Sequence, residues 1–78
     1  MTNNHEIEIH IDKKAYKVAS QSLTGAELRD TAQPPIGPQY DLYEEVPGGT
    51  DILINTAVSY ALHNGMHFFT APSTINPG

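Results

Sequence analysis

The residue in this sequence that is best placed to do chemistry is the last one, Gly78. It ends the segment Thr70-Ala-Pro-Ser-Thr-Ile-Asn-Pro-Gly78, whose prolines and small polar residues disfavour helix and sheet. Because glycine has no Cβ, an enzyme cleft could close tightly around this end and reach its carboxylate. The segment therefore predicts a carboxyl terminus that is itself the reactive group. The alternative interpretation is a loosely ordered or trimmed chain end.

The four histidines suggest a metal site at first sight: His5, His10, His63 and His67. His63 and His67 are four residues apart, but Gly65 lies between them and predicts that no helix aligns them. No acidic residue lies at a spacing that would complete a ligand set. We therefore expect polar surface histidines and no metal.

Enzyme motifs are absent from the sequence. Pro47-Gly48-Gly49-Thr50 lacks the strand-to-helix context and the lysine of phosphate-binding loops, and no serine lies in a nucleophile-elbow pattern. A chain of 78 residues makes one domain with a modest core, too small for a deep cleft framed by several catalytic loops. We therefore expect a ligand or module that is not an enzyme and that holds no cofactor.

Composition excludes further classes of partner. Nine acidic and four basic residues give a formal net charge of -5, so we expect neither nucleic-acid nor membrane binding. The sequence has no cysteine, so no disulfide supports the fold. Its N-terminal residues lack the basic and apolar regions of a signal peptide, and no apolar stretch is long enough to span a membrane. We therefore expect a cytoplasmic protein.

The elements that must position Gly78 begin with a β-hairpin. Isoleucines alternate with polar residues over 6–12, which is the period of a half-buried strand. A second strand follows over 16–18, so Lys13 and Lys14 are expected at the tip of the hairpin.

A short helix is predicted over 25–32. Thr24 fits the N-cap and Glu27 the third helical position, so their side chains can form a capping box. The prolines that follow end the helix. Leu28 is expected on its inner face, while Glu27 and Arg29 remain solvated.

The rest of the chain reads as strands and turns. We predict a strand over 40–46, a short edge strand over 51–54, an irregular helical turn over 57–62 and a last strand over 66–70 that Pro72 ends. The chain thus divides into a domain over 1–71 and a flexible tail over 72–78. The fold class is α+β, a mixed sheet of four to five strands with one short helix packed across it.

Four groups of residues carry a resemblance to a known family. They are Leu23-Thr24-Gly25-Ala26-Glu27-Leu28, Tyr40-Asp41-Leu42-Tyr43, Gly65 before Phe68-Phe69, and Pro72 with Ile75-Asn76-Pro77-Gly78. In this order they resemble the β-grasp fold, and more narrowly the bacterial ubiquitin-like proteins of the multiubiquitin type. The resemblance covers almost the whole chain.

What the resemblance implies is protein conjugation. An activating enzyme would use ATP to adenylate Gly78, and a conjugating enzyme would pass the acyl group as a thioester to a target protein. The resemblance also implies a processing or deconjugating metalloprotease and a role in phage defence. The enzymes would recognise the tail residues Pro72, Ser73, Thr74, Ile75, Asn76 and Pro77. Because the tail lacks the basic residues and paired glycines of ubiquitin, these enzymes would be dedicated ones.

A second candidate site is the outer face of the sheet. Phe68 and Phe69 are consecutive, so one is expected in the core and the other outside. We expect a recognition patch there, made of His10, Met66, His67 and Phe69. The alternative is that the outer phenylalanine is covered by Tyr16 or by the tail.

Other interpretations stay open at the level of sequence. Lys13, Lys14 and Lys17 could accept further copies in a chain of modifiers, although solvated lysines need no such role. The domain could be a non-covalent interaction module that binds partners through its sheet. It could also be a sulfur carrier, with a thiocarboxylate at Gly78.

Overall fold

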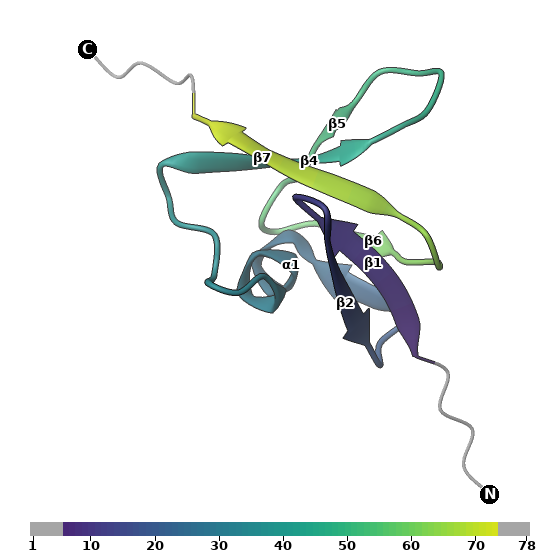
Figure 1. The fold of residues 1–78 in the computed structure, drawn as a ribbon. Helices are drawn as coiled ribbons and strands as arrows, with labels where there is room; N and C mark the ends of the chain where they lie inside the picture. Colours follow the sequence, from purple (N-terminus) through teal and green to yellow (C-terminus); the bar gives the residue numbers. More distant parts are fainter. Residues whose placement is uncertain (1–5, 74–78) are drawn as a thin grey trace, which may run out of the picture.

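The computed structural model describes residues 6–73 of the chain. Within these residues the elements are, in order, β1 (Ile7–Ile11), β2 (Lys14–Val18), β3 (Ser22–Thr24), α1 (Gly25–Thr31), β4 (Tyr40–Glu45), β5 (Ile52–Leu53), β6 (Ser59–Ala61) and β7 (His67–Pro72). Five strands form one sheet in the order β2-β1-β7-β4-β5, and the described part of the chain also has a two-stranded sheet of β3 and β6. Figure 1 shows β1 and β7 side by side at the centre of the larger sheet.

The hairpin of β1 and β2 forms where the isoleucine alternation predicted it. Ile9 and Ile11 are buried, and β2 pairs antiparallel with β1. Asp12 and Lys13 make the turn with φ values of 51° and 71°, the left-handed backbone that a tight two-residue hairpin turn requires. Lys13 is therefore at the tip as predicted, whereas Lys14 already begins β2.

Helix α1 begins with the predicted capping box. The Glu27 N–H donates to Thr24 Oγ1 at 3.2 Å, and the Thr24 N–H donates to Glu27 Oε1 at 2.8 Å. The helix ends at Thr31, one residue earlier than predicted. The expectation of a solvated Arg29 is wrong, because its half-buried Nη2 donates to the carbonyls of Gly37 at 2.6 Å and Tyr40 at 2.8 Å. These two bonds join the helix to the start of β4.

The helical turn predicted over 57–62 is wrong, because residues 59–61 of this segment form strand β6. It pairs antiparallel with β3, with Leu23 opposite Tyr60. The loop before β6 also receives the first N–H groups of the helix, because Gly25 N donates to Val58 O and Ala26 N to Thr56 O. These backbone groups have no partner within a helix, so the loop completes the helix start.

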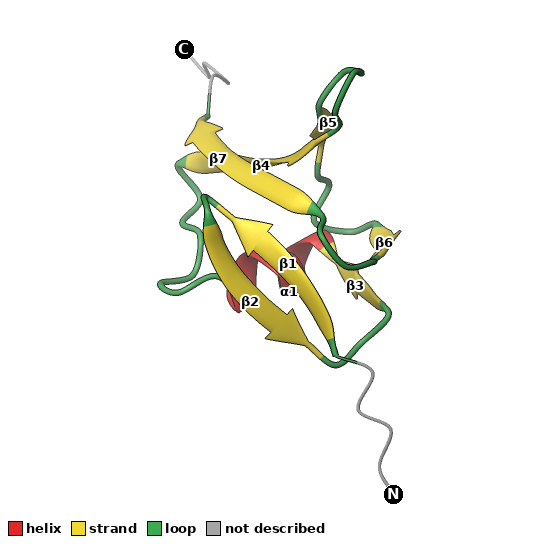
Figure 2. Ribbon diagram, turned by 45° about the vertical axis from the view of Figure 1, so that its right-hand side comes forward, coloured by secondary structure: helices red, strands yellow, loops and turns green. Residues whose placement is uncertain are grey.

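The core lies between α1 and one face of the large sheet, which Figure 2 shows with the helix against β1 and β2. Its fully buried side chains come from three different elements, namely Ile9 of β1, Leu28 of α1 and Leu42 of β4. Phe68 of β7 and Met66 just before that strand are also buried. Burial of each such side chain is worth about 1.5–3 kcal/mol, so this small core fixes the inner face of the sheet. None of the buried core side chains of residues 6–73 lies on the outer face.

Candidate functional site

Strand β7 carries the chain toward the predicted reactive end. It pairs with β4 along its whole length, from His67 opposite Glu45 to Pro72 opposite Tyr40. The strand was predicted to end at Thr70 but continues to Pro72, because a proline at the last position of a strand costs the ladder few hydrogen bonds. The Ser73 N–H then donates to Gln39 O at 2.8 Å. The sheet thus holds the chain as far as residue 73.

The reactive end itself lies outside the described residues. This applies to Gly78 and to the tail residues Thr74, Ile75, Asn76 and Pro77. Their role in conjugation and the division of the chain into a domain over 1–71 and a tail over 72–78 remain predictions. Of the predicted tail, the structure places Pro72 and Ser73 at the end of β7, next to β4.

The end of β7 is also tied to the hairpin turn. Thr70 N donates to Asp12 Oδ1 at 2.9 Å, and Thr70 Oγ1 donates to Asp12 Oδ2 at 2.6 Å. Asp12 N in turn donates to Phe68 O at 3.0 Å. Three bonds therefore join the tip of the β1–β2 hairpin to β7, and they align the last strand with the middle of the sheet.

The outer face of the sheet carries two pairs of stacked rings. Phe69 lies opposite Tyr43 in the register of β7 and β4, and their ring centroids are 5.3 Å apart with an interplanar angle of 12°. This distance is within the range of favourable aromatic stacking. The alternative of cover by Tyr16 is wrong, because Tyr16 lies opposite Ile9 and its hydroxyl accepts a hydrogen bond from Gln33 N. The alternative of cover by the tail concerns a segment of which residues 74–78 lie outside the described range.

His10 and His67 form the second pair. They are partners in the parallel register of β1 and β7, and their centroids lie 4.7 Å apart, again at 12°. His10 Nε2 is 3.9 Å from a carboxylate oxygen of Glu8, while its Nδ1 is buried without a hydrogen-bond partner among the described residues. The structure therefore brings together three members of the predicted patch, namely His10, His67 and Phe69.

The fourth predicted member of the patch, Met66, belongs elsewhere. Only 6% of its surface is exposed, and its sulfur accepts a hydrogen bond from His63 N. Met66 lies two residues before Phe68 and therefore faces the core with it, which the alternation of side chains along a strand could have indicated. Sequence reasoning also missed Tyr43 as a member of the patch, because its pairing with Phe69 depends on which strands are neighbours.

The predicted acceptor lysines differ in their surroundings. All three have exposed side chains, but Lys14 Nζ donates to the carbonyl of Gln33 at 3.2 Å. Lys13 and Lys17 make no side-chain hydrogen bond or ion pair with any residue in the described range. Their role as acceptors remains a prediction.

Metal and membrane sites can be judged only for the described part of the chain. There, no three His, Asp or Glu side chains gather closely enough to hold a metal ion. No helix in residues 6–73 is long and apolar enough to cross a bilayer.

The arrangement of the sheet and helix defines the class of protein. A mixed sheet with two parallel central strands, a β-hairpin at its start and one short helix across a single face is the β-grasp architecture of ubiquitin-like domains. The predicted fold class is thereby confirmed.

The comparison with family models identifies the family. Residues 7–74 match the family model described as Multiubiquitin, and this match covers nearly the whole chain. The chain therefore belongs to the multiubiquitin family. Comparisons with curated proteins and with solved structures gave no match.

Proposed function

We propose that this chain is a bacterial ubiquitin-like protein modifier that is joined to target proteins through the carboxylate of Gly78. The observation that carries the proposal is membership of the multiubiquitin family over residues 7–74. Strand β7 adds support, because it leads the chain out of the sheet just before the segment that ends in Gly78. The domain would act as a handle and would have no catalytic activity of its own.

The chemistry requires activation, because a free carboxylate is a poor acyl donor. The Gly78 carboxylate would attack the α-phosphate of ATP on an activating enzyme, forming an acyl adenylate and releasing pyrophosphate. A cysteine thiolate of that enzyme would then displace AMP to give a thioester, which a cysteine of the conjugating enzyme would take over. Finally a lysine amine of the target would displace the thiolate and lose a proton, leaving an amide.

Other partners follow from the same chemistry. A metalloprotease would cleave behind Gly78, either to free the carboxylate or to release the modifier from its target. The absence of arginine and of paired glycines at this end predicts enzymes with a groove shaped for Asn76-Pro77. We place the system in the cytoplasm and in phage defence, where such modification would label proteins during infection.

The direct test is activation of the purified chain in the presence of ATP and the proposed activating enzyme. We expect pyrophosphate release and an adduct at Gly78, detected by intact-protein mass spectrometry. A variant that lacks Gly78 should lose at least about 100-fold of this activity, because the acyl donor is then a proline in a restricted conformation. Its thermal melt should be unchanged, since the last buried core side chain among the described residues is that of Phe68.

Two further results would decide between interpretations. If the variant without Gly78 is still activated, the proposal is wrong. If the product carries a terminal thiocarboxylate and no amide-linked target, the chain is a sulfur carrier. Mass spectrometry separates these outcomes because sulfur replaces one oxygen in the first case and a whole protein is added in the second.

A further inference from the structure

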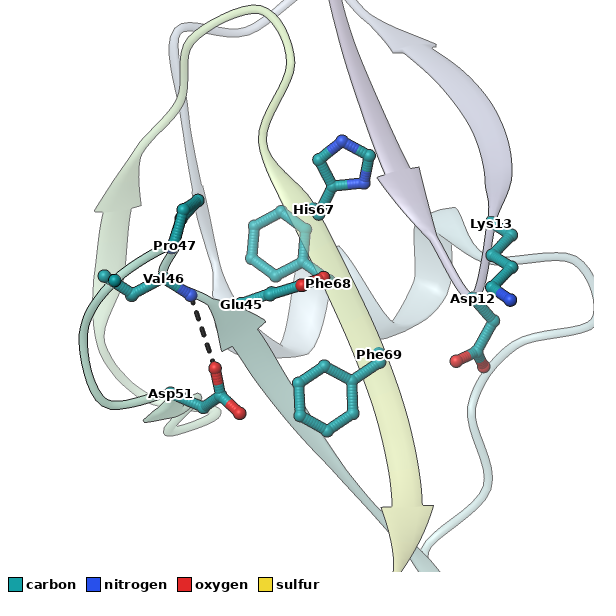
Figure 3. Close-up of a pocket in the computed structure, with 10 residues that line it drawn as sticks. Asp12, Lys13, Glu45, Val46, Pro47, Asp51, His67, Phe68 and Phe69 are labelled. Carbon is teal, nitrogen blue, oxygen red and sulfur yellow. Dashed lines mark hydrogen bonds between the residues drawn. The ribbon is translucent and has the colours of Figure 1, made fainter.

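The outer face of the sheet contains a hollow of about 540 Å³ whose lining combines an aromatic ring with carboxylates. It lies between the turn of the β1–β2 hairpin, strand β7 and the loop from β4 to β5. Figure 3 shows the ring of Phe69 on the side of β7 that faces Asp51, with Glu45 nearby and Asp12 and Lys13 across the strand.

The aromatic part of the hollow is held in a fixed orientation. Phe69 is half-buried, and its ring stacks on Tyr43 of the neighbouring strand. A ring packed in this way loses little further side-chain freedom when a ligand binds to it. The exposed part of its π-system is negative and attracts cations.

The charged part of the hollow has an excess of carboxylates. Asp12, Glu45 and Asp51 line it, against the single amine of Lys13. Both oxygens of Asp12 accept hydrogen bonds from Thr70, and one oxygen of Asp51 accepts from Val46 N at 3.3 Å. The side-chain carboxylate of Glu45 makes no hydrogen bond or ion pair with any other described residue. Glu45 and the second oxygen of Asp51 therefore remain available to an external cation.

We propose that this hollow binds an arginine side chain presented by a partner protein. A guanidinium group is planar, so it can stack on Phe69 while its edge donates to the carboxylates of Glu45 and Asp51. The ammonium group of lysine is a point charge, so it cannot stack on the ring and donate to both carboxylates as well as a guanidinium group can. The net charge of -5 favours the approach of a basic partner.

The surroundings of the hollow fit a protein segment. A second hollow of about 550 Å³ shares Glu45, Val46, Pro47 and His67 with the first and continues past His63 and Met66. The residues on either side of the arginine could lie along this shared wall. The proposal does not depend on conjugation, because the groups it uses are the ring of Phe69 and the carboxylates of Glu45 and Asp51, which belong to the described part of the domain.

The test is an NMR titration of the full chain, labelled with ¹⁵N, with the peptide acetyl-Gly-Arg-Gly-amide. We expect saturable shift changes centred on the amides of Glu45, Asp51 and Phe69, with a Kd on the order of millimolar. The same peptide with glutamine in place of arginine should give no saturable change. The lysine peptide should bind about threefold more weakly than the arginine peptide.

Variants of the chain test the two parts of the hollow separately. Glu45→Gln and Phe69→Leu should each raise the Kd by about threefold. The matched control is Asp30→Asn, which removes one negative charge from the exposed side of α1 across the sheet and should leave the Kd unchanged. Thermal melts of all three variants separate loss of binding from loss of folding. Glu45→Gln changes an exposed side chain, so its effect on the Kd can be measured in a folded chain.

Several results would overturn the proposal. They are equal responses to the arginine and glutamine peptides, shift changes centred on another face, or a Kd that rises as much for Asp30→Asn as for Glu45→Gln. An equal affinity for the lysine peptide would show a site for positive charge in general. A variant without Gly78 should bind the peptide unchanged, so this test and the activation test fail independently.

Discussion

Gly25 lies where its surroundings leave no space for a Cβ. It begins α1 and lies against the loop before β6, where a Cβ would overlap the carbonyl group of Asn55 and approach the backbone of Thr56. These are backbone atoms, so they can move away only if the whole loop shifts and breaks the bonds from Gly25 to Val58 and from Ala26 to Thr56.

We therefore expect Gly25→Ala to lower the free energy of unfolding by about 3 kcal/mol, at the upper end of overpacking effects. Gly48→Ala is the comparison, since a Cβ there meets open space and costs only the strain of a φ near +75°, about 1 kcal/mol. Urea denaturation of both variants measures the difference. Equal losses would show that the contact with Asn55 does not constrain the fold.

At the scale of residues, burial could be predicted wherever apolar and polar residues alternate along a strand without interruption. Ile9 and Ile11 are buried as the alternation around them indicated, and Phe68 and Phe69 lie on opposite faces. Met66 was misplaced although it lies two residues before Phe68 and is buried with it, as the alternation between these two residues indicates. The stack of Phe69 on Tyr43 joins residues 26 positions apart, and no local pattern reports such a contact.

At the scale of elements, the helix is the part that sequence predicted best. Its capping box uses side chains three residues apart, so all the information needed is local. Strand β6 shows the opposite case. Its three residues have no apolar alternation of their own, and they are extended because β3 pairs with them. Pairing between distant segments cannot be read from either segment alone.

The capping box gives a prediction for the helix. Thr24→Ala removes the hydroxyl that accepts from Glu27 N and should lower the free energy of unfolding by about 1 kcal/mol. Thr24→Ser keeps an oxygen at the same position and should lose only a few tenths of that amount. Both values come from chemical denaturation. If serine is as harmful as alanine, the methyl group of Thr24 matters and the cap does not.

At the scale of the whole molecule, the fold class could be predicted because it depends on the order of the elements. A chain with a leading hairpin, then one helix, then further strands can adopt only a few sheet topologies. The candidate site was predicted only in part. His10, His67 and Phe69 were expected on one face, whereas Tyr43, Glu45 and Asp51 join them through the register of β4 and the loop that follows it. The segment over 74–78 lies outside the described residues, so its chemistry rests on sequence and family.

The parallel pairing of β1 with β7 has a mechanical consequence. The described chain enters the sheet at Ile7, runs along β1 in the same direction as β7, and leaves after Pro72. Tension applied at residues 6 and 73 therefore pulls the two central strands past each other. Hydrogen bonds such as His10 N to Met66 O and Asp12 N to Phe68 O would then be strained together. By contrast, Tyr40 and Pro72 are paired at one end of the antiparallel strands β4 and β7, so tension at residues 39 and 73 would break their bonds one after another.

Because the chain has no cysteine, the substitution pairs Glu6→Cys with Ser73→Cys and Gln39→Cys with Ser73→Cys provide unique attachment points for single-molecule pulling. The first geometry should unfold at the higher force when both are pulled at the same rate, since forced unfolding follows the barrier along the pulled direction. Equal forces would show that the central pair does not resist shear. A domain with this topology can pass tension between its neighbours while its core stays closed.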